Sequence, residues 1–227
     1  MTVGDAAVVA AAFVVAGLAK GALGMGLPPV ALGILSLALP LDASLAIMVI
    51  PTMLTNVWQA IYGGGFRRLM RRFGGMAAAS VVALLSVALV FGKLGTPTAA
   101  GWVGVVLVVY ALLALTAWRP AVSRDAERWA NPLMGALSGA VAGITGVAAV
   151  PFLPYMQSLD MDRHELVQAL GIMFLFIIGA LTAALALQGS FTPLNLAGGI
   201  GAIAPTFLGV WLGQKARQRI SAEKFRL

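Results

Sequence analysis

Long apolar runs alternate with short polar or basic stretches along the whole chain. Three of these runs, 74–92, 98–118 and 166–187, contain no charged residue. Each is close to the roughly 20 apolar residues that a helix needs to cross a hydrocarbon core about 30 Å thick. The pattern predicts seven apolar helical segments, at 5–39, 43–66, 74–92, 98–118, 132–158, 166–187 and 193–213.

Composition places these segments in a bilayer. Hydrophobic residues make up 60% of the chain and charged residues 10%, against roughly 25% charged in a soluble domain. A soluble protein of 227 residues could not bury this much apolar surface, because buried area grows too slowly with mass. We therefore predict an all-α integral membrane protein.

Two segments are interrupted by glycines with prolines after them, and the two interruptions match. At a constant spacing of 122, Gly17, Gly21, Gly24 and Pro29 fall on Gly139, Gly143, Gly146 and Pro151. Further on, 74–75 falls near 198–199. We interpret the chain as repeat 1 (1–118), a basic cytoplasmic loop (119–131), repeat 2 (132–213) and a basic tail (214–227).

The positions of the basic residues favour a re-entrant path for the fifth segment. If all seven segments crossed, seven Lys and Arg would lie on each side, against the rule that cytoplasmic loops are rich in them. If segment 132–158 returns to its own side, thirteen lie inside, Lys93 lies outside and Lys20 lies within the membrane. Irregular backbone at depth is tolerated where protein or a cavity covers it. By repeat symmetry, segment 5–39 also turns back, and the repeats are inverted.

Interrupted helices in corresponding positions indicate a transport site at the membrane midplane. A half-helix N-terminus carries partial positive charge and binds anions, so we expect the breaks to supply Gly21, Gly24, Gly26, Gly143, Thr145 and Gly146. The alternative is that these glycines are small-residue packing faces. The prediction is a permease that exports a small anion by alternating access.

Other polar residues extend this candidate site. Lys20 is a charge inside a membrane segment, which by default indicates function; the alternative is that it lies near a helix end and extends to the interface. A polar stripe on segment 43–66 offers hydrogen bonds to an oxyanion or, alternatively, between helices. Its members are Thr52, Thr55, Asn56 and Gln59.

Acidic residues fall only at segment ends and in loops, so no mid-membrane carboxylate is expected to relay protons or hold sodium. Anion export down a negative-inside potential gains about 2.3 kcal/mol per charge per 100 mV and needs no coupling ion. With no cysteine in the chain, thiolate chemistry is excluded, and we expect no cofactor and no metal site. The net charge of +7 is expected to interact with anionic lipid headgroups rather than with nucleic acid. A homodimer is left open.

Two other classes of protein are alternatives to a permease. An intramembrane serine hydrolase would use Ser138, but it needs a base within hydrogen-bond reach, and the single histidine, His164, is expected at a solvated helix start. Asp162 is predicted to cap that helix, with Glu165 completing a capping box. A non-transporting membrane assembly subunit is the remaining alternative.

The chain resembles the sulfite exporter TauE/SafE family of bacterial membrane permeases. The resemblance rests on the glycine-rich breaks at 17–29 and 139–151, on the turn 63–66 echoed by 188–193, and on 209–213 followed by basic residues. It implies transport of sulfur-containing or organic anions, such as sulfite and sulfonates, outward across the bacterial inner membrane.

Overall fold

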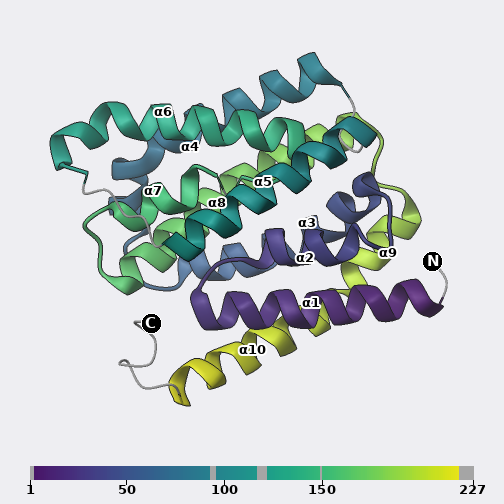
Figure 1. The fold of residues 1–227 in the computed structure, drawn as a ribbon. Helices are drawn as coiled ribbons and strands as arrows, with labels where there is room; N and C mark the ends of the chain where they lie inside the picture. Colours follow the sequence, from purple (N-terminus) through teal and green to yellow (C-terminus); the bar gives the residue numbers. More distant parts are fainter. Residues whose placement is uncertain (1–2, 93–95, 117–121, 149, 220–227) are drawn as a thin grey trace. The chain divides into compact units, whose positions relative to one another are not determined.

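The computed structural model describes residues 3–92, 96–116, 122–148 and 150–219, and within these ranges it contains helices and no strands (Figure 1). The prediction of an all-helical membrane protein is supported. Five helical stretches are long and apolar enough to cross a membrane, namely 4–23, 41–61, 66–91, 163–187 and 193–217. Residues 101–113 add a shorter apolar helix. The count of seven segments therefore stays a prediction.

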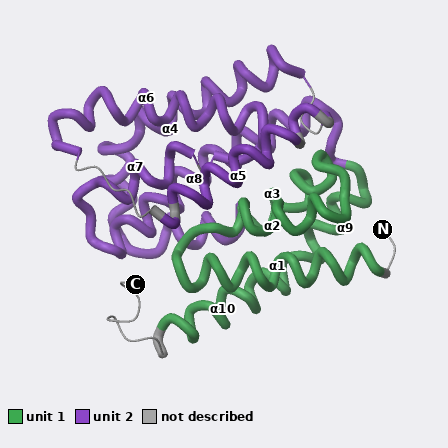
Figure 2. Tube along the Cα trace, in the orientation of Figure 1, with its two compact units in different colours: residues 1–52, 192–227 green, residues 53–191 purple. Residues whose placement is uncertain are grey.

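The chain forms two compact units, drawn in different colours in Figure 2. Unit 1 contains residues 1–52 and 192–227, and unit 2 contains residues 53–191. The boundary falls inside helix α3 (Leu41–Ile61), one residue after Pro51, which interrupts the backbone hydrogen bonding of that helix. Each unit thus draws helices from both predicted repeats.

Unit 1 is built around α1 (Val3–Leu23) and α10 (Ile203–Arg219), which lie side by side (Figure 1). The short helices α2 (Leu27–Leu35) and α9 (Pro193–Gly201) pack beside this pair. Thr192 caps α9 by accepting a hydrogen bond from the backbone N–H of Asn195 at 3.2 Å. Pro193 follows at the first helical position, where a missing N–H costs nothing.

Unit 2 is built around α4 (Phe66–Phe91) and α6 (Arg124–Thr145). The helices α5 (Pro97–Thr116), α7 (Phe152–Ser158) and α8 (Arg163–Leu187) pack on this pair. Phe152 and Phe174 meet edge to face at 5.1 Å in its core. Asp162 accepts hydrogen bonds from the backbone N–H groups of His164 and Glu165 at 2.8 and 2.9 Å, which confirms the predicted N-cap of α8.

Two predicted loops are partly helical. α4 begins at Phe66, so Arg67 to Arg72 form its first turns and do not lie in a loop before residue 74. α6 begins at Arg124, inside the predicted loop 119–131. Apolar pattern alone misses such turns, because arginine is a good helix former and the helix extends past the apolar segment.

Glycines bring the central helix pair of each unit into close contact. In unit 1, a methyl group on Gly17 or Gly21 would overlap the carbonyl oxygen of Thr206 or Val210. In unit 2, Gly139 and Gly143 would meet the carbonyl oxygens of Ser80 and Leu84 in the same way. In both pairs, the later glycine of one helix contacts the later carbonyl of the other, so the two helices run parallel. Backbones approach this closely only where side chains are absent.

These two sets of contacts correspond. The glycines of α6 lie 122 residues after those of α1, and the oxygens on α10 lie 126 residues after those on α4. Thr206 and Ser80 also share a feature, since each hydroxyl donates to a backbone carbonyl oxygen three or four residues earlier, that of Ala202 at 2.6 Å and that of Ala77 at 2.8 Å. The first helix of each predicted repeat therefore packs on a helix from the other repeat.

Candidate transport site

The first break separates α1 from α2 at residues 24–26. Gly24 and Gly26 have φ angles of 81° and 97°, a left-handed conformation that glycine adopts without steric cost. The N–H of Gly24 donates to the carbonyl oxygen of Lys20 at 2.7 Å and ends α1. α1 is thus interrupted at glycines within the segment where a break was predicted.

The start of α2 offers fewer anion donors than the sequence pattern suggested. Pro28 and Pro29 occupy its second and third positions, and proline has no N–H to donate. The N–H of Val30 already donates to Gly26 at 3.2 Å. In the first turn of α2, Leu27 is therefore the residue whose backbone N–H could still bind an anion. A positive contribution at this break therefore depends on the side chain of Lys20.

Lys20 lies in the last turn of α1 and is 7% exposed. Among residues 3–66, all of which the structure describes, it is the one lysine or arginine. Burying a long basic side chain is costly unless it has polar or anionic partners. Its burial favours a role inside the protein over extension to the membrane interface.

The second break follows α6 at Gly146, whose φ is 74°. Its N–H donates to the carbonyl oxygen of Ala142 at 2.7 Å, the same bond and distance as at Gly24. Thr145 donates to Val141 at 2.8 Å and accepts from the N–H of Val147 at 3.1 Å. Thr145 thus shapes the break through its own backbone contacts; residue 149, within the break, lies outside the described residues.

The polar stripe of α3 is buried and is divided at the unit boundary. Thr52 belongs to unit 1, whereas Thr55, Asn56 and Gln59 belong to unit 2. The Gln59 amide donates to the carbonyl oxygen of Val167 in α8 at 2.7 Å, so this residue connects two helices as the alternative interpretation expected. A binding role for the stripe stays a prediction.

Gln168 completes this connection. Its amide donates to the carbonyl oxygen of Ala60 at 2.9 Å, and its oxygen accepts from the N–H of Gly65 at 3.1 Å. Gln59 and Gln168 therefore bond to each other's helices reciprocally, and they fix the turn between α3 and α4. No feature of the sequence pattern pointed to Gln168.

A buried ionic network in unit 2 was also missed. Arg72 donates two hydrogen bonds to Glu127, at 2.8 and 2.7 Å, and lies 3.8 Å from Glu165. Asn131 donates to the carbonyl oxygen of Arg72 at 3.1 Å, and Tyr155 donates to the Asn131 oxygen at 2.5 Å. The network joins α4, α6, α7 and α8. The signal available in the sequence was the pair of opposite charges next to apolar segments.

The carboxylates and Ser138 bear on the hydrolase alternative. Within the described ranges, no three His, Asp or Glu side chains gather as metal ligands would. Ser138 is fully buried, and its hydroxyl has no hydrogen-bond partner in the described part of the chain. His164 is exposed at the start of α8. A nucleophile needs a base in hydrogen-bond reach, so this geometry does not favour a hydrolase.

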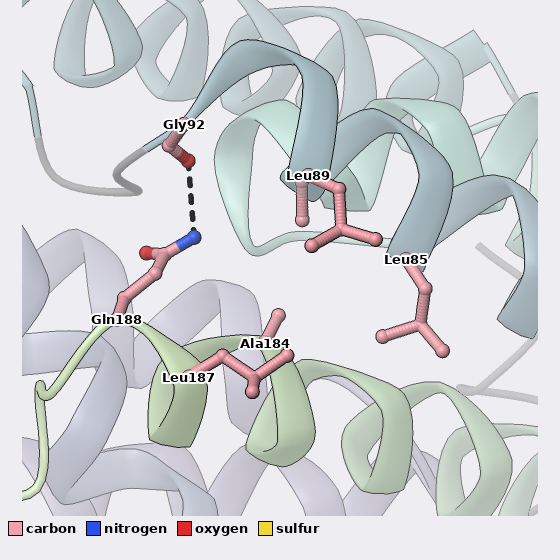
Figure 3. Close-up of a pocket in the computed structure, with 7 residues that line it drawn as sticks. Leu85, Leu89, Gly92, Ala184, Leu187 and Gln188 are labelled. Carbon is pink, nitrogen blue, oxygen red and sulfur yellow. Dashed lines mark hydrogen bonds between the residues drawn. The ribbon is translucent and has the colours of Figure 1, made fainter.

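Two pockets lie among the described residues of unit 2. The smaller, of about 310 Å³, lies between the ends of α4 and α8 (Figure 3). It is lined by leucines, and its amide, Gln188, donates to the carbonyl oxygen of Gly92 at 3.0 Å. The larger, of about 600 Å³, lies between α5, α6 and α7, and Pro151, which directly precedes α7, is among the residues that line it.

Long apolar helices, broken helices and apolar side chains on the helix surfaces together define a multi-pass membrane protein. Trp102, Val108 and Leu112 on α5 are each more than half exposed, and a bilayer covers such surfaces.

The comparison with known protein families also points to a membrane protein. The model of the family described as Sulfite exporter TauE/SafE matches residues 9–227, and the chain belongs to that family. Its members are membrane transporters and not enzymes. No curated protein and no solved structure showed significant similarity to the chain.

Proposed function

We propose that this protein is a permease of the bacterial inner membrane that exports a small anion, a sulfur oxyanion or an organosulfonate. The observation that carries the proposal is the matched pair of glycine breaks at Gly24 and Gly146, with Lys20 buried one turn before the first. Broken helices in corresponding positions of two repeats typically bind the substrate of a transporter.

Each break contributes in its own way. In the first, Lys20 supplies the charge, because the prolines of α2 leave few backbone donors. In the second, α6 ends at Thr145 and Gly146, and the N–H groups of Gly146 and Val147 already donate to Ala142 and Thr145, so this break contributes irregular backbone rather than a set of free donors. Thr52, Thr55 and Asn56 add polar groups along α3, all of them buried.

The acidic residues support export without a coupling ion. Asp5, Asp42, Asp125, Glu127 and Glu165 lie in the first turns of their helices. None of these carboxylates lies in the middle of its helix, where a proton or sodium site would need it. The membrane potential alone favours anion exit by about 2.3 kcal/mol per charge per 100 mV.

The matched contacts of the two units also support inverted repeats. Because α6 repeats the break of α1 and the glycine contacts of α1 with α10 recur between α6 and α4, the chain has the internal equivalence that alternating access uses. We propose that 132–158 and 5–39 are re-entrant, as the distribution of basic residues predicts.

Efflux from proteoliposomes tests the function. Vesicles containing the purified protein are loaded with labelled sulfite, methanesulfonate or acetate, and a potential is imposed. We expect saturable efflux of at least one sulfur anion that rises with the potential, and none from protein-free vesicles. Absence of flux at every potential and pH gradient would overturn the proposal, and strict dependence on a proton gradient would overturn its uncoupled mechanism.

A further inference from the structure

The chain passes between its two compact units at two places, once within α3 and once just before α9 (Figure 2). The first crossing lies between residues 52 and 53, one residue after Pro51, and the second lies between Phe191 and Thr192. If each unit moves as one body, the backbone angles must change at these two places.

The N-terminal half of α3 is fixed to unit 1. Proline has no N–H, so Pro51 deprives the carbonyl oxygen of Ile47 of the donor that a regular helix would give it. Gly199 of α9 packs against this carbonyl group, since a methyl group on Gly199 would lie 3.0 Å from its oxygen. The part of α3 that precedes the proline is therefore held by close backbone packing within its own unit.

The C-terminal half of α3 is fixed to unit 2 by α8. Gln59 donates to the carbonyl oxygen of Val167 at 2.7 Å, and Gln168 donates to that of Ala60 at 2.9 Å. One turn further along α8, a methyl group on Gly171 would lie 2.8 Å from the Gln59 side chain. The two halves of α3 are thus held by different partners, with the proline between them.

The second crossing leaves one residue between two closed helix ends. The N–H of Ser190 donates back to a carbonyl oxygen of α8 at 3.0 Å, and Gly189 before it has a φ of 71°. Thr192 is already the N-cap of α9. The backbone angles of Phe191 can therefore change without opening either helix end.

Each unit, by contrast, has the packing of a rigid body. The central helix pair of each unit meets at glycines where a methyl group would overlap a backbone carbonyl oxygen. In unit 2, the buried pair of Arg72 and Glu127 adds two hydrogen bonds between α4 and α6. Close-packed interiors resist continuous deformation, so motion concentrates where the packing is interrupted.

We propose that Pro51 and Phe191 form a hinge about which the two compact units move as rigid bodies, and that this motion is the conformational step of transport. The inference rests on the proposed function. Prolines are the usual sites of sharp bends in helices, and hinges are a few residues that absorb a change in backbone angles.

The same packing excludes the sequence repeats as the moving bodies. Separating repeat 1 from repeat 2 would pull α1 away from α10 and α4 away from α6, and these are the glycine contacts at the centre of each unit. Motion about the hinge leaves all of these contacts intact.

Pairs of spin labels measure this motion, because the chain has no cysteine of its own. Leu37→Cys/Tyr62→Cys places one label before and one after α3, in different units, at side chains 86% and 73% exposed. Leu37→Cys/Trp211→Cys stays within unit 1, and Tyr62→Cys/Leu187→Cys stays within unit 2. In proteoliposomes, we expect the cross-unit distance to shift when methanesulfonate or sulfite is added, and both within-unit distances to stay the same.

Pro51→Ala tests the hinge without any ligand. It restores the N–H that can donate to Ile47, so α3 becomes stiffer, and we expect the cross-unit distance distribution to narrow. Efflux turnover should fall about twofold to twelvefold, which corresponds to the about 0.5–1.5 kcal/mol of one hydrogen bond, with little change in the anion concentration for half-maximal efflux. Pro51→Gly also restores the N–H but keeps the backbone easy to bend, and it should lie between the wild type and Pro51→Ala.

The matched control is Pro132→Ala, at a proline inside α6 and within unit 2, which should change neither the distances nor the turnover. If Pro51→Ala leaves the cross-unit distribution as it is in the wild type, or if the within-unit distances shift as much as the cross-unit distance, the hinge is wrong and the permease stands. If the cross-unit distance responds to Pro51→Ala but no anion leaves the vesicles, the permease is refuted, and with it the role of the hinge in transport.

Discussion

At Lys20, one basic side chain lies buried in a part of the chain that has no other lysine or arginine between residues 3 and 66. Two of the backbone donors that a helix start would give an anion are replaced by Pro28 and Pro29. If the first break binds an anion, this side chain is the group that attracts it.

We expect Lys20→Met, which keeps most of the side-chain volume, to weaken anion affinity in the efflux assay by about 10- to 100-fold. This corresponds to the 1.5–3 kcal/mol of a hydrogen bond to a charged group. Lys20→Arg should retain part of the affinity. Lys215→Met, at an exposed residue of α10, is the control. Unchanged affinity in Lys20→Met would show that the lysine does not contact the substrate.

Asp162 makes the start of α8 sensitive to pH. Backbone hydrogen bonds from Glu165 and His164 lower the pKa of this carboxyl from its ordinary value of 3.8. A lowered folded-state pKa contributes stability that is complete above the unfolded pKa, about 3.9, and is lost as the pH falls through the folded value.

Asp162→Asn keeps a good cap that does not titrate. We therefore expect wild type to be the more stable protein at neutral pH, and the difference in unfolding temperature to shrink as the pH falls below about 4. Thermal unfolding in detergent across this range measures it. A difference that does not change with pH would mean that the carboxylate charge contributes nothing to the cap.

At the scale of elements, the glycine contacts decide whether the central helices can pair. Gly139 would place a methyl group on the carbonyl oxygen of Ser80, whereas Gly179 in α8 has nothing within 4 Å. Gly139→Ala should destabilise the protein by about 1–3 kcal/mol through overpacking. Gly179→Ala should cost nothing, since alanine is the better helix former. Equal unfolding temperatures for the two variants would contradict this packing.

The Arg72–Glu127 pair connects the same helices by charge. Its side chains are 18% and 8% exposed, and without Glu127 the partly buried Arg72 keeps only Glu165, at 3.8 Å, as a nearby carboxylate. The cost is therefore expected to be below the about 3–5 kcal/mol of leaving a buried charge unpaired. We expect Glu127→Gln to lower the unfolding temperature markedly. The double variant Arg72→Met/Glu127→Met removes both charges of this pair, and it should recover part of the lost unfolding temperature. A double variant less stable than Glu127→Gln would show that the pair is worth more than its desolvation.

At the scale of the molecule, the positive charges predict which ends of the helices face the cytoplasm. The predicted re-entrant path places the end of α8 outside, whereas seven full crossings would place it inside. Because the chain has no cysteine, a single introduced thiol reports on one position.

We expect Leu187→Cys, at a side chain 74% exposed, to react with an impermeant maleimide added outside intact cells. Tyr62→Cys, 73% exposed, should react only after permeabilisation, because the Arg-rich start of α4 keeps that turn inside. Protection of Leu187→Cys until permeabilisation would favour seven crossings over the re-entrant path.

The two compact units also show which helices of the predicted repeats pair with one another. Unit 1 pairs the first helix of repeat 1 with the last helix of repeat 2, and unit 2 pairs α4 of repeat 1 with α6 of repeat 2. The compact units are therefore not the sequence repeats. A chain that carried only one of the two predicted repeats would lack one member of each central pair.

What the sequence alone determined follows from local causes. The length of an apolar run decides whether a helix can cross the bilayer, and glycine followed by proline interrupts a helix wherever it occurs. The breaks at Gly24 and Gly146 and the cap at Asp162 were predictable for this reason. Each depends on residues within a few positions.

The tertiary structure decided the pairings between distant residues. Nothing near Gly139 indicates that it packs on Ser80, and the charges of Arg72 and Glu127 do not by themselves show that the two pair across 55 residues. Gln59, predicted from its helical face, bonds to α8 through Val167, because a polar amide in an apolar bundle binds the nearest available carbonyl. Which carbonyl that is depends on how helices pack, and packing is a property of the folded chain.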